Sequence, residues 1–536
     1  MNRFAKSISC VLFLSTLFAV GSKAQTINAA SCSAADVQAA LNSVTTSGTT
    51  VKVPAGNCTW ASGVKLTTSL SVTVMGASTV ATSDSHGNPA SFNDNTVITD
   101  GFGGPLLNLG TAGNNTSQLV RVSGITIKAT SQSTYELSLG SGGQVRIDHC
   151  HFIGLNPDAR VWSYGVADHN LHDANGNMVA NAFQVFTDSQ NNGNVAWNSP
   201  TQFGTANFFF IENNTFNDGF GNDCNEGGRY VARYNTFHGT LQNGATLQSH
   251  ATGAVQTPPW RGCRAWEIYN NWVTSTYSGG AFAFSQNFSG TGVQYNNTVT
   301  GQNHDLFILN DRDQKQTNYT QVAPPLGWGY CGTYQTGVGS PWDGNANLNG
   351  SNGSPCIDQP GRGQGDMLQG FFPSVCDLTA GLCALSNFLG SWPHQYLEPI
   401  YLWNDTWTCP GCSSSPSQIS ISSPENNIVM NRDVYADTGA SCAQNATTCS
   451  SGVGVGTLAQ RPSNCTAGPG GTYYTSPTGS YGVGWWATDQ NTLYACSSTN
   501  NWTAIYTPYT YPHPLAQGTG TSSNVAPPSN LTAVVQ

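Results

Sequence analysis

A six-residue pattern recurs through the middle of the chain. It occurs at residues 147–152, 167–172, 211–216, 232–237, 268–273 and 294–299, as "IDHCHF", "ADHNLH", "IENNTF", "ARYNTF", "IYNNWV" and "QYNNTV". The fourth position holds Cys150, Asn170, Asn214, Asn235, Asn271 and Asn297, at spacings of 20, 44, 21, 36 and 26 residues. A period of about 22 residues with insertions predicts a solenoid, because each unit is too short to bury an apolar face alone.

Within each unit, the apolar positions are expected to point inward. They are Ile147, Ala167, Ile211, Ala232 and Ile268 before the shared position, and Phe152, Phe216, Phe237, Val273 and Val299 after it. The Asn side chains are predicted to sit at a bend and to hydrogen-bond from coil to coil, as amide ladders do in stacked parallel strands. Cys150 shares this slot and is therefore expected to be a buried thiol. His172 and Gln294 break the apolar rule.

The start of the chain predicts a cap for this stack. Ser33 is an N-cap candidate for a helix over 33–44, with Val37, Leu41 and Val44 at helical spacing. Strand-like segments follow in "TTVKVPAGNCTW" and "LSVTVMGA". Such a helix would cover the open apolar end of a solenoid.

These features, with "VSGITI" at 122–127, resemble the right-handed parallel β-helix, or pectate lyase-like, superfamily over about residues 30 to 310. The resemblance implies an all-β fold, a right-handed parallel β-helix with a capping helix. The Gly-, Pro- and Asn-rich residues 311–395 are expected to form a long loop excursion, and the strand-like runs in 440–505 a small C-terminal β appendage. The expected organisation is a signal peptide (1–24), cap and coils (25–310), a disulfide-held excursion (311–395), final coils (396–439), an appendage and C-terminal cap (440–515) and a linker-like tail (516–536).

Composition favours an exported protein. The basic start, the short apolar run and the small residues near Ala24 are typical of a secretory signal peptide, and the run from Ile8 to Val20 is too short to span a membrane. Only 9% of residues are charged and the net charge is −10, which makes nucleic acid an unsuitable partner. A secreted monomer without a membrane span is expected.

Fifteen cysteines remain after the signal, and export favours disulfides. Proximity in sequence suggests the pairs Cys32–Cys58, Cys224–Cys263, Cys331–Cys356, Cys376–Cys383, Cys409–Cys412, Cys442–Cys449 and Cys465–Cys496. Cys150 is left unpaired.

The position two before the ladder is predicted to face outward. It holds, in chain order, Asp148, Asp168, Glu212, Arg233, Tyr269 and Tyr295. Coils stack about 4.8 Å apart, so these residues would form one exposed stripe. One interpretation is a solvated surface with a Glu212–Arg233 ion pair. The other is a sugar groove in which the tyrosines bind pyranose rings and the carboxylates serve a cation or catalysis.

The turn "NDGFGNDCNEGGR" adds acids beside the same coil edge, among them Asp223 and Glu226. Oxygen-rich clusters suit Ca²⁺, so Asp148, Asp168, Glu212, Asp223 and Glu226 are the candidate ligands. The spacing is not that of an EF-hand. An acidic turn that only aids solubility is the alternative.

The largest breaks in the period, at 241–264 and after Gly301, are interpreted as loops that wall a binding site. They carry His250, Trp260, Arg261 and Arg264, and a structural role for His250 is the plain alternative. The expected partner is a polysaccharide.

In the resembling lyases a cation or Arg neutralises a uronate carboxylate, and a base removes the adjacent proton. No lysine lies in 208–275, unlike the lyase branch that carries a base Lys on its calcium-binding coil. Arg233 and His250 are therefore the candidate bases and Arg264 the substrate clamp, with Tyr269, Tyr295, Trp260 and Arg261 binding sugar.

Two other functions remain open. An inverting glycoside hydrolase would use a carboxyl pair such as Asp148 with Asp168 or Asp223 with Glu226. "GNDC" at 221–224 resembles the "GDDC" of polygalacturonases, but their other motifs are missing. The third possibility is a non-catalytic glycan-binding or cell-surface β-helix.

Overall fold

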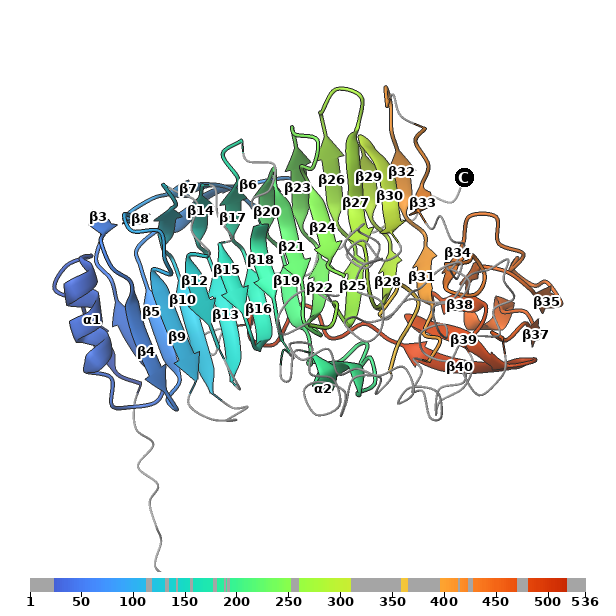
Figure 1. Cartoon of the computed structure of the whole chain (residues 1–536), viewed down its shortest axis with the longest axis horizontal. Helices are drawn as coiled ribbons and strands as arrows, with labels where there is room; N and C mark the ends of the chain where they lie inside the picture. Colours follow the sequence, from blue (N-terminus) through green and yellow to red (C-terminus); the bar gives the residue numbers. More distant parts are fainter. Residues whose placement is uncertain are drawn as a thin grey trace, which may run out of the picture.

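The computed structural model describes residues 24–111, 118–130, 135–140, 143–154, 158–176, 181–187, 189, 193–251, 260–309, 358–364, 396–412, 415–422, 428–469 and 481–517. Three long parallel sheets wind around one core as a right-handed parallel β-helix (Figure 1). The predicted signal peptide and the pairs Cys331–Cys356 and Cys376–Cys383 lie outside the described residues, as does most of 311–395 and of the tail.

Each coil contributes one strand to each sheet. Sheet A contains β1 (Thr26–Asn28), β2 (Thr49–Lys52), β5 (Val72–Met75), β10 (Leu119–Ser123), β13 (Gln144–Asp148), β16 (Tyr164–Asp168), β19 (Phe209–Glu212), β22 (Arg229–Arg233), β25 (Ala265–Tyr269), β28 (Thr291–Tyr295), β31 (Ile400–Trp403) and β34 (Val434–Ala436). Sheet B contains β3 (Gly56–Trp60), β8 (Thr96–Asp100), β11 (Thr126–Lys128), β14 (His151–Ile153), β17 (Leu171–Asp173), β20 (Thr215–Asn217), β23 (Thr236–Gly239), β26 (Trp272–Ser275), β29 (Thr298–Thr300) and β32 (Thr406–Thr408).

Sheet C contains β4 (Val64–Thr68), β9 (Leu107–Thr111), β12 (Leu137–Leu139), β15 (Ala159–Val161), β18 (Asn181–Val185), β21 (Phe220–Cys224), β24 (Thr246–Ser249), β27 (Ala281–Asn287), β30 (Gln302–Leu309) and β33 (Ile419–Ser422). Strands β24 and β30 fall in the two segments that were interpreted as loops. For Thr246–Ser249 and Gln302–Leu309 that interpretation is wrong, because these residues pair as strands of this sheet.

The bend between sheets A and B carries the predicted amide ladder. The Asn235 amide donates to Asn271 Oδ1 over 3.0 Å, and its own Oδ1 accepts from the Asn214 amide over 3.1 Å. The same side-chain amide bond joins Asn170 to Asn214 and Asn271 to Asn297. At the last coil, Asp405 Oδ1 accepts from the Asn297 side-chain amide. The residue before each ladder position is left-handed, as at Tyr234 with φ of 57°. The ladder is confirmed.

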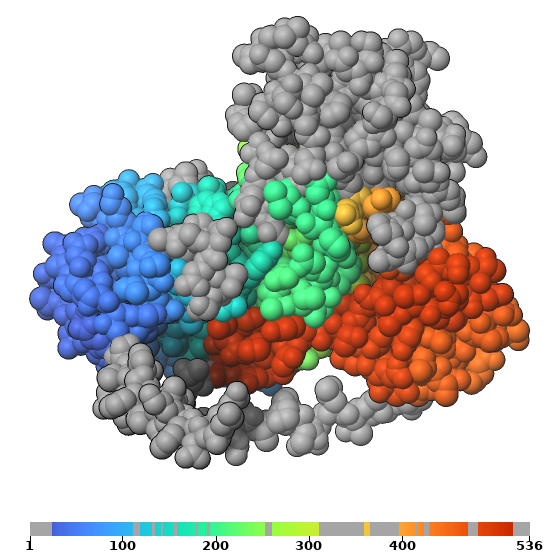
Figure 2. Space-filling model, turned by 90° about the horizontal axis from the view of Figure 1, so that it is seen from below, coloured from blue at the N-terminus to red at the C-terminus, as the bar shows by residue number. Residues whose placement is uncertain are grey.

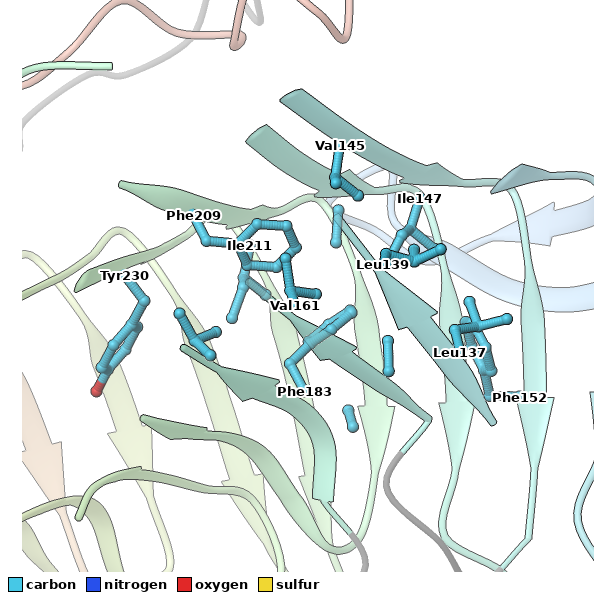
Figure 3. Packing of buried hydrophobic residues seen from close by; sticks show 14 of the residues in the cluster. Leu137, Leu139, Val145, Ile147, Phe152, Val161, Phe183, Phe209, Ile211 and Tyr230 are labelled. Carbon is cyan, nitrogen blue, oxygen red and sulfur yellow. The ribbon is translucent and has the colours of Figure 1, made fainter. Parts of the chain in front are cut away.

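Inward side chains fill the interior, as Figure 3 shows for strands of all three sheets. The predicted inward residues Ile147, Ala167, Ile211, Ala232 and Ile268 are fully buried. Phe152, His172 and Phe216 form a stacked column, with ring centroids 4.9 and 4.7 Å apart. His172 therefore replaces an aromatic ring in the core. Cys150 is a buried free thiol, as predicted, and burial raises its pKa to about 12.

The two ends of the stack differ (Figure 1). Helix α1 (Ala34–Asn42) packs Val37 and Leu41 into the first coils, and Ser33 Oγ caps it by accepting from the Asp36 N–H over 3.2 Å. At the other end lies the appendage, with β35 (Thr448–Cys449), β36 (Val453–Gly456), η3 (Leu458–Gln460), β37 (Asn464–Cys465), β38 (Gly484–Ala487), β39 (Thr492–Ser498) and β40 (Asn501–Tyr506). A short helix α2 (Asn194–Trp197) lies beside the central coils.

Five of the expected disulfides are present: Cys32–Cys58, Cys224–Cys263, Cys409–Cys412, Cys442–Cys449 and Cys465–Cys496. These bonds suggest an extracellular or secreted protein. Among the described residues, no helix is long and apolar enough to cross a membrane.

A hairpin of β6 (Thr79–Ser83) and β7 (Pro89–Asn93) lies against sheet B. Just after it, Asp94 accepts from His151 Nδ1 at 2.9 Å, while His151 Nε2 contacts Asp173 at 2.9 Å. Both imidazole nitrogens thus face carboxylates. Burial disfavours the imidazolium, but the bonds to Asp173 and Asp94 outweigh it and raise the pKa of His151.

We predict that Asn235→Ala lowers the free energy of unfolding by about 3 kcal/mol, because it leaves buried donors and acceptors of the ladder without partners. Denaturant unfolding would measure this. Asn57→Ala, on the exposed side of β3, is the matched control and should shift the midpoint little. Equal effects of the two substitutions would contradict the ladder's contribution.

The His151 contacts predict a pH-dependent stability. Because the pKa of folded His151 is raised, its contribution is fully present below the unfolded value of about 6.5 and is lost as pH rises through the folded value. The thermal midpoint of the wild type should therefore fall between about pH 6 and about pH 9 more steeply than that of His151→Gln. His238→Gln, exposed on the same sheet, should keep the wild-type slope.

Candidate functional site

The outward row of sheet A is a column, as predicted, but it is not exposed. Asp148, Asp168, Glu212 and Arg233 have no exposed surface, and Tyr269 and Tyr295 expose 2% each. Residues 507–515, which we call the C-terminal segment, lie against Glu212 and Arg233. The appendage packs on Tyr295, and Asp148 and Asp168 are paired with arginines. Figure 2 shows the red C-terminal residues against the teal and green coils. The expected exposed sugar groove on this stripe is therefore wrong.

Arg233 binds the C-terminal segment. Its guanidinium donates to Glu212 Oε2 at 2.7 Å, to the Tyr269 hydroxyl at 2.9 Å, and to the carbonyls of Tyr509 and Thr510 at 2.7 and 2.9 Å. Burial disfavours its charge, but Tyr269 and Glu212 outweigh that effect and raise the pKa of Arg233. A cation held in this way is a structural anchor and a poor base.

The acids of the same row also hold cations. Both carboxylate oxygens of Asp148 accept from the Arg121 guanidinium, each over 2.6 Å. Both oxygens of Asp168 accept from the Arg146 guanidinium in the same way, each over 2.9 Å. Burial opposes ionisation of Asp148, but bonds from Arg121 and His149 prevail and lower its pKa. Within the described ranges, no three His, Cys, Asp or Glu side chains form a group that could hold a metal ion. The five proposed Ca²⁺ ligands, Asp148, Asp168, Glu212, Asp223 and Glu226, are thus not brought together.

The two tyrosines predicted to bind sugar instead pack the appendage onto the stack. Tyr269 and Tyr295 stack with centroids 4.7 Å apart, and Tyr295 stacks on Trp403 at 4.5 Å. The Tyr506 hydroxyl lies 3.2 Å from that of Tyr295 and donates to Glu267 Oε2 at 2.9 Å. No ring face in this stack is open to a sugar.

Arg261 and Arg264 are buried as well. Arg261 donates to both oxygens of Asp358, at 2.5 Å and 2.7 Å, and Arg264 donates to Glu398 at 2.9 Å. Their guanidinium carbons lie 4.9 and 5.1 Å from the Trp197 ring. These contacts fix loops to sheet A, which leaves Arg264 unable to clamp a substrate without breaking them. Trp260 is half-buried.

An open groove of about 540 Å³ lies instead over sheet C. Its walls combine aromatic rings with amides: Asn181, Phe220, Gln242, Asn243, Gln248, His250, Phe282, Gln286, Phe288, Phe307 and Leu309. The strand register aligns Arg160, Gln184, Asp223, Gln248, Gln286 and Phe307 in one row across six coils. Rings and amides of this kind suit a sugar chain, because they offer apolar faces beside donors and acceptors for hydroxyl groups.

His250 is the predicted residue that lines this groove. Its Nδ1 lies 3.2 Å from Asp223 Oδ1, and one quarter of its side chain is exposed. Its backbone is fixed on both sides, since its N–H donates to the carbonyl of Cys224 and its carbonyl accepts from the Cys263 N–H. The Cys224–Cys263 disulfide locks this arrangement. An ionised Asp223 accepts only, so Nδ1 then carries the proton and Nε2 keeps the lone pair.

Glu226 completes the acidic part of this region. Its backbone is left-handed, with φ of 47°, in the turn after β21. Burial raises the pKa of Glu226, and the nearby Arg160 opposes that shift. The sequence pointed to Asp223, Glu226 and His250, but it missed Phe282, Phe307, Gln248 and Gln286. The available signal was the run of amides and aromatic residues in 242–248 and 282–307.

Comparison with known proteins does not assign this chain to a family. No protein-family model matches the chain, and no curated protein matches it. Among solved structures, ORF18 of Geobacillus virus E2 is 12% identical with a TM-score of 0.23, over 52% of this chain and 56% of that one. The match thus spans little more than half of the viral protein's length.

We predict that Arg233→Ala lowers the free energy of unfolding by about 3 to 5 kcal/mol, because it strands the buried Glu212 carboxylate. The double substitution Arg233→Met with Glu212→Leu should recover much of that loss, since it removes both charges. Thermal and denaturant unfolding would measure both. A stable Arg233→Ala protein would argue that the C-terminal segment is not held in this way.

Proposed function

We propose that this protein binds a polysaccharide in the groove over sheet C and cleaves it, with His250 as the proton-accepting group. The observation that carries the proposal is the His250–Asp223 pair on the wall of an open groove lined by Phe282, Phe307 and amide side chains. A carboxylate that orients an imidazole produces a base near neutral pH.

The reaction that best fits this pair is β-elimination at a uronic acid. His250 Nε2 takes the proton from the carbon next to the carboxylate, and that electron pair forms a carbon–carbon double bond. The bond to the glycosidic oxygen at the neighbouring carbon breaks, and the leaving oxygen is protonated. Glu226, whose raised pKa favours the protonated form, is the nearby acid of the groove region.

One observation favours hydrolysis as the second candidate. Asp223 and Glu226 flank the end of β21, and burial raises the pKa of Glu226 as a general acid requires. Hydrolysis adds water across the glycosidic bond and creates no double bond. The two reactions therefore leave different products.

The test is a screen of the full-length protein on polygalacturonate, alginate, chondroitin sulfate and a neutral glucan. Ultraviolet absorbance reports unsaturated ends, and a reducing-end assay reports all cleavage. We expect both signals on a uronate polymer and a loss of at least about 100-fold in His250→Ala, the size of a general-base contribution. His238→Ala, exposed on sheet B, should keep full activity.

Reducing ends without ultraviolet absorbance would support hydrolysis instead. Full cleavage by His250→Ala would overturn the assignment of the base. Binding of a polymer without either signal would leave a glycan-binding protein.

A further inference from the structure

We propose that Arg160 forms an anion-binding subsite at the β15 end of the sheet C row, where it binds a carboxylate or sulfate carried by a sugar of the bound chain. This inference rests on the proposed function for the location of the polysaccharide. It does not depend on His250 being a base.

Arg160 lies among aromatic rings at the surface. Its guanidinium carbon is 4.4 Å from the Tyr135 ring centroid, 5.1 Å from that of Phe186 and 5.8 Å from that of Trp162. All three rings are half-buried, so the cluster is reachable from solvent. Such rings hold the guanidinium in place and offer apolar contact to a sugar.

In the part of the chain that the structure describes, no carboxylate lies within ion-pair distance of Arg160, unlike several other arginines of the stack. Arg121, Arg146, Arg233, Arg261 and Arg264 each hold an acid within 4.0 Å, as the structure describes them. Arg160 donates Nε and Nη2 to one neutral acceptor, Gln184 Oε1, at 2.9 and 2.7 Å. Burial lowers the pKa of Arg160, and the nearby Tyr135, Glu226 and Asp223 oppose that shift.

The position of Arg160 connects it to the groove. It occupies the same outward row as Asp223, two strands away, which corresponds to about 10 Å at the usual strand spacing. The charges of Glu226 and Asp223 both favour the cationic form of Arg160 and so raise its pKa, against the larger effect of burial. A polymer lying along the row would therefore pass from His250 to Arg160.

The negative net charge of the chain explains why an anionic polymer would need a local cation such as Arg160. The chain has a net charge of −10, so an anionic polymer is repelled overall and requires local cations. A planar guanidinium with one donor pair engaged can bind carboxylate or sulfate oxygens through its other nitrogen, Nη1, and through its charge. Arg121, Arg146 and Arg233 on sheet A are each paired with an acid. Among the six aligned residues from Arg160 to Phe307, Arg160 is the cation offered to a substrate.

The test measures binding of the full-length protein to four polymers by calorimetry at two salt concentrations. Polygalacturonate carries carboxylates, dextran sulfate carries sulfates, and dextran and a neutral glucan carry neither. We expect the wild type to bind one anionic polymer more tightly than the neutral ones, and added salt to weaken that binding. Arg160→Gln should weaken it by about 10-fold or more, as the loss of a charged hydrogen bond implies.

Two further variants sharpen the result. Arg160→Lys should bind with intermediate affinity, because it keeps the charge but loses the planar fork. Arg461→Gln is the matched control, since Arg461 also lies over aromatic rings, Tyr494 at 4.5 Å and Trp502 at 5.4 Å, but in the appendage. Its affinity should be unchanged. Unchanged thermal midpoints would show that all the variants fold.

The proposal is overturned if Arg160→Gln binds the anionic polymers as the wild type does, or if the wild type binds them no better than dextran. The preferred polymer tells carboxylate from sulfate. If His250→Ala still cleaves while Arg160→Gln loses binding, the assignment of His250 as the base fails and the subsite stands.

Discussion

The structure depends on the vertical register of its coils. A parallel strand pairs only with the coils above and below, so every bend must repeat one backbone shape and bury one set of polar groups. The left-handed residue before each ladder amide provides that shape. The ladder also has two ends: at the first coil the Cys150 backbone N–H donates to Asn170 Oδ1, and at the last coil Asp405 Oδ1 accepts from the backbone and side-chain amides of Asn297. Gln294, apparently misplaced in the core, donates to Asp305 and Asp405 at 2.8 and 3.0 Å.

Register alone does not decide which outer face meets solvent. It aligns outward side chains on every sheet, but later parts of the chain cover one face and leave another open. On sheet A the covering is polar and specific: Glu212 accepts from the His513 N–H at 2.8 Å, and Tyr511 stacks on Tyr234 at 3.8 Å. Charges in that row are therefore satisfied within the protein. On sheet C, Gln248, Gln286 and Phe307 of the aligned row line an open groove.

The limits of sequence reasoning follow from this difference. The repeat predicted the fold, the inward residues and the ladder, and proximity in sequence predicted the five disulfides, because these features depend on local pattern and short separations. The repeat correctly predicted that Arg233 lies in a column of outward residues, but the predicted exposure of Arg233 was wrong. The reason is that the covering residue Tyr509 is 276 positions away in sequence. The segment containing β24 was interpreted as a loop because it lacks the ladder Asn, although its Gln248 belongs to the sheet C row. His250 was found because it stood beside acids.

The arginines of this protein differ in role: Arg233 stabilises the fold, and Arg160 is the proposed ligand-binding residue. Arg233 has Glu212, a tyrosine hydroxyl and two carbonyls around it, and moving it toward a ligand would expose a buried carboxylate at a cost of several kcal/mol. Among the described residues, Arg160 donates to one amide oxygen and lies over aromatic rings, with no carboxylate at ion-pair distance. An incoming anion therefore has no salt bridge to displace there. A search of the sequence for arginine and acidic residues therefore finds the buried ion pairs, such as Arg233 with Glu212, before it finds Arg160. An arginine that is not paired with a carboxylate of the protein is a better candidate for binding a ligand than an arginine chosen by residue type alone.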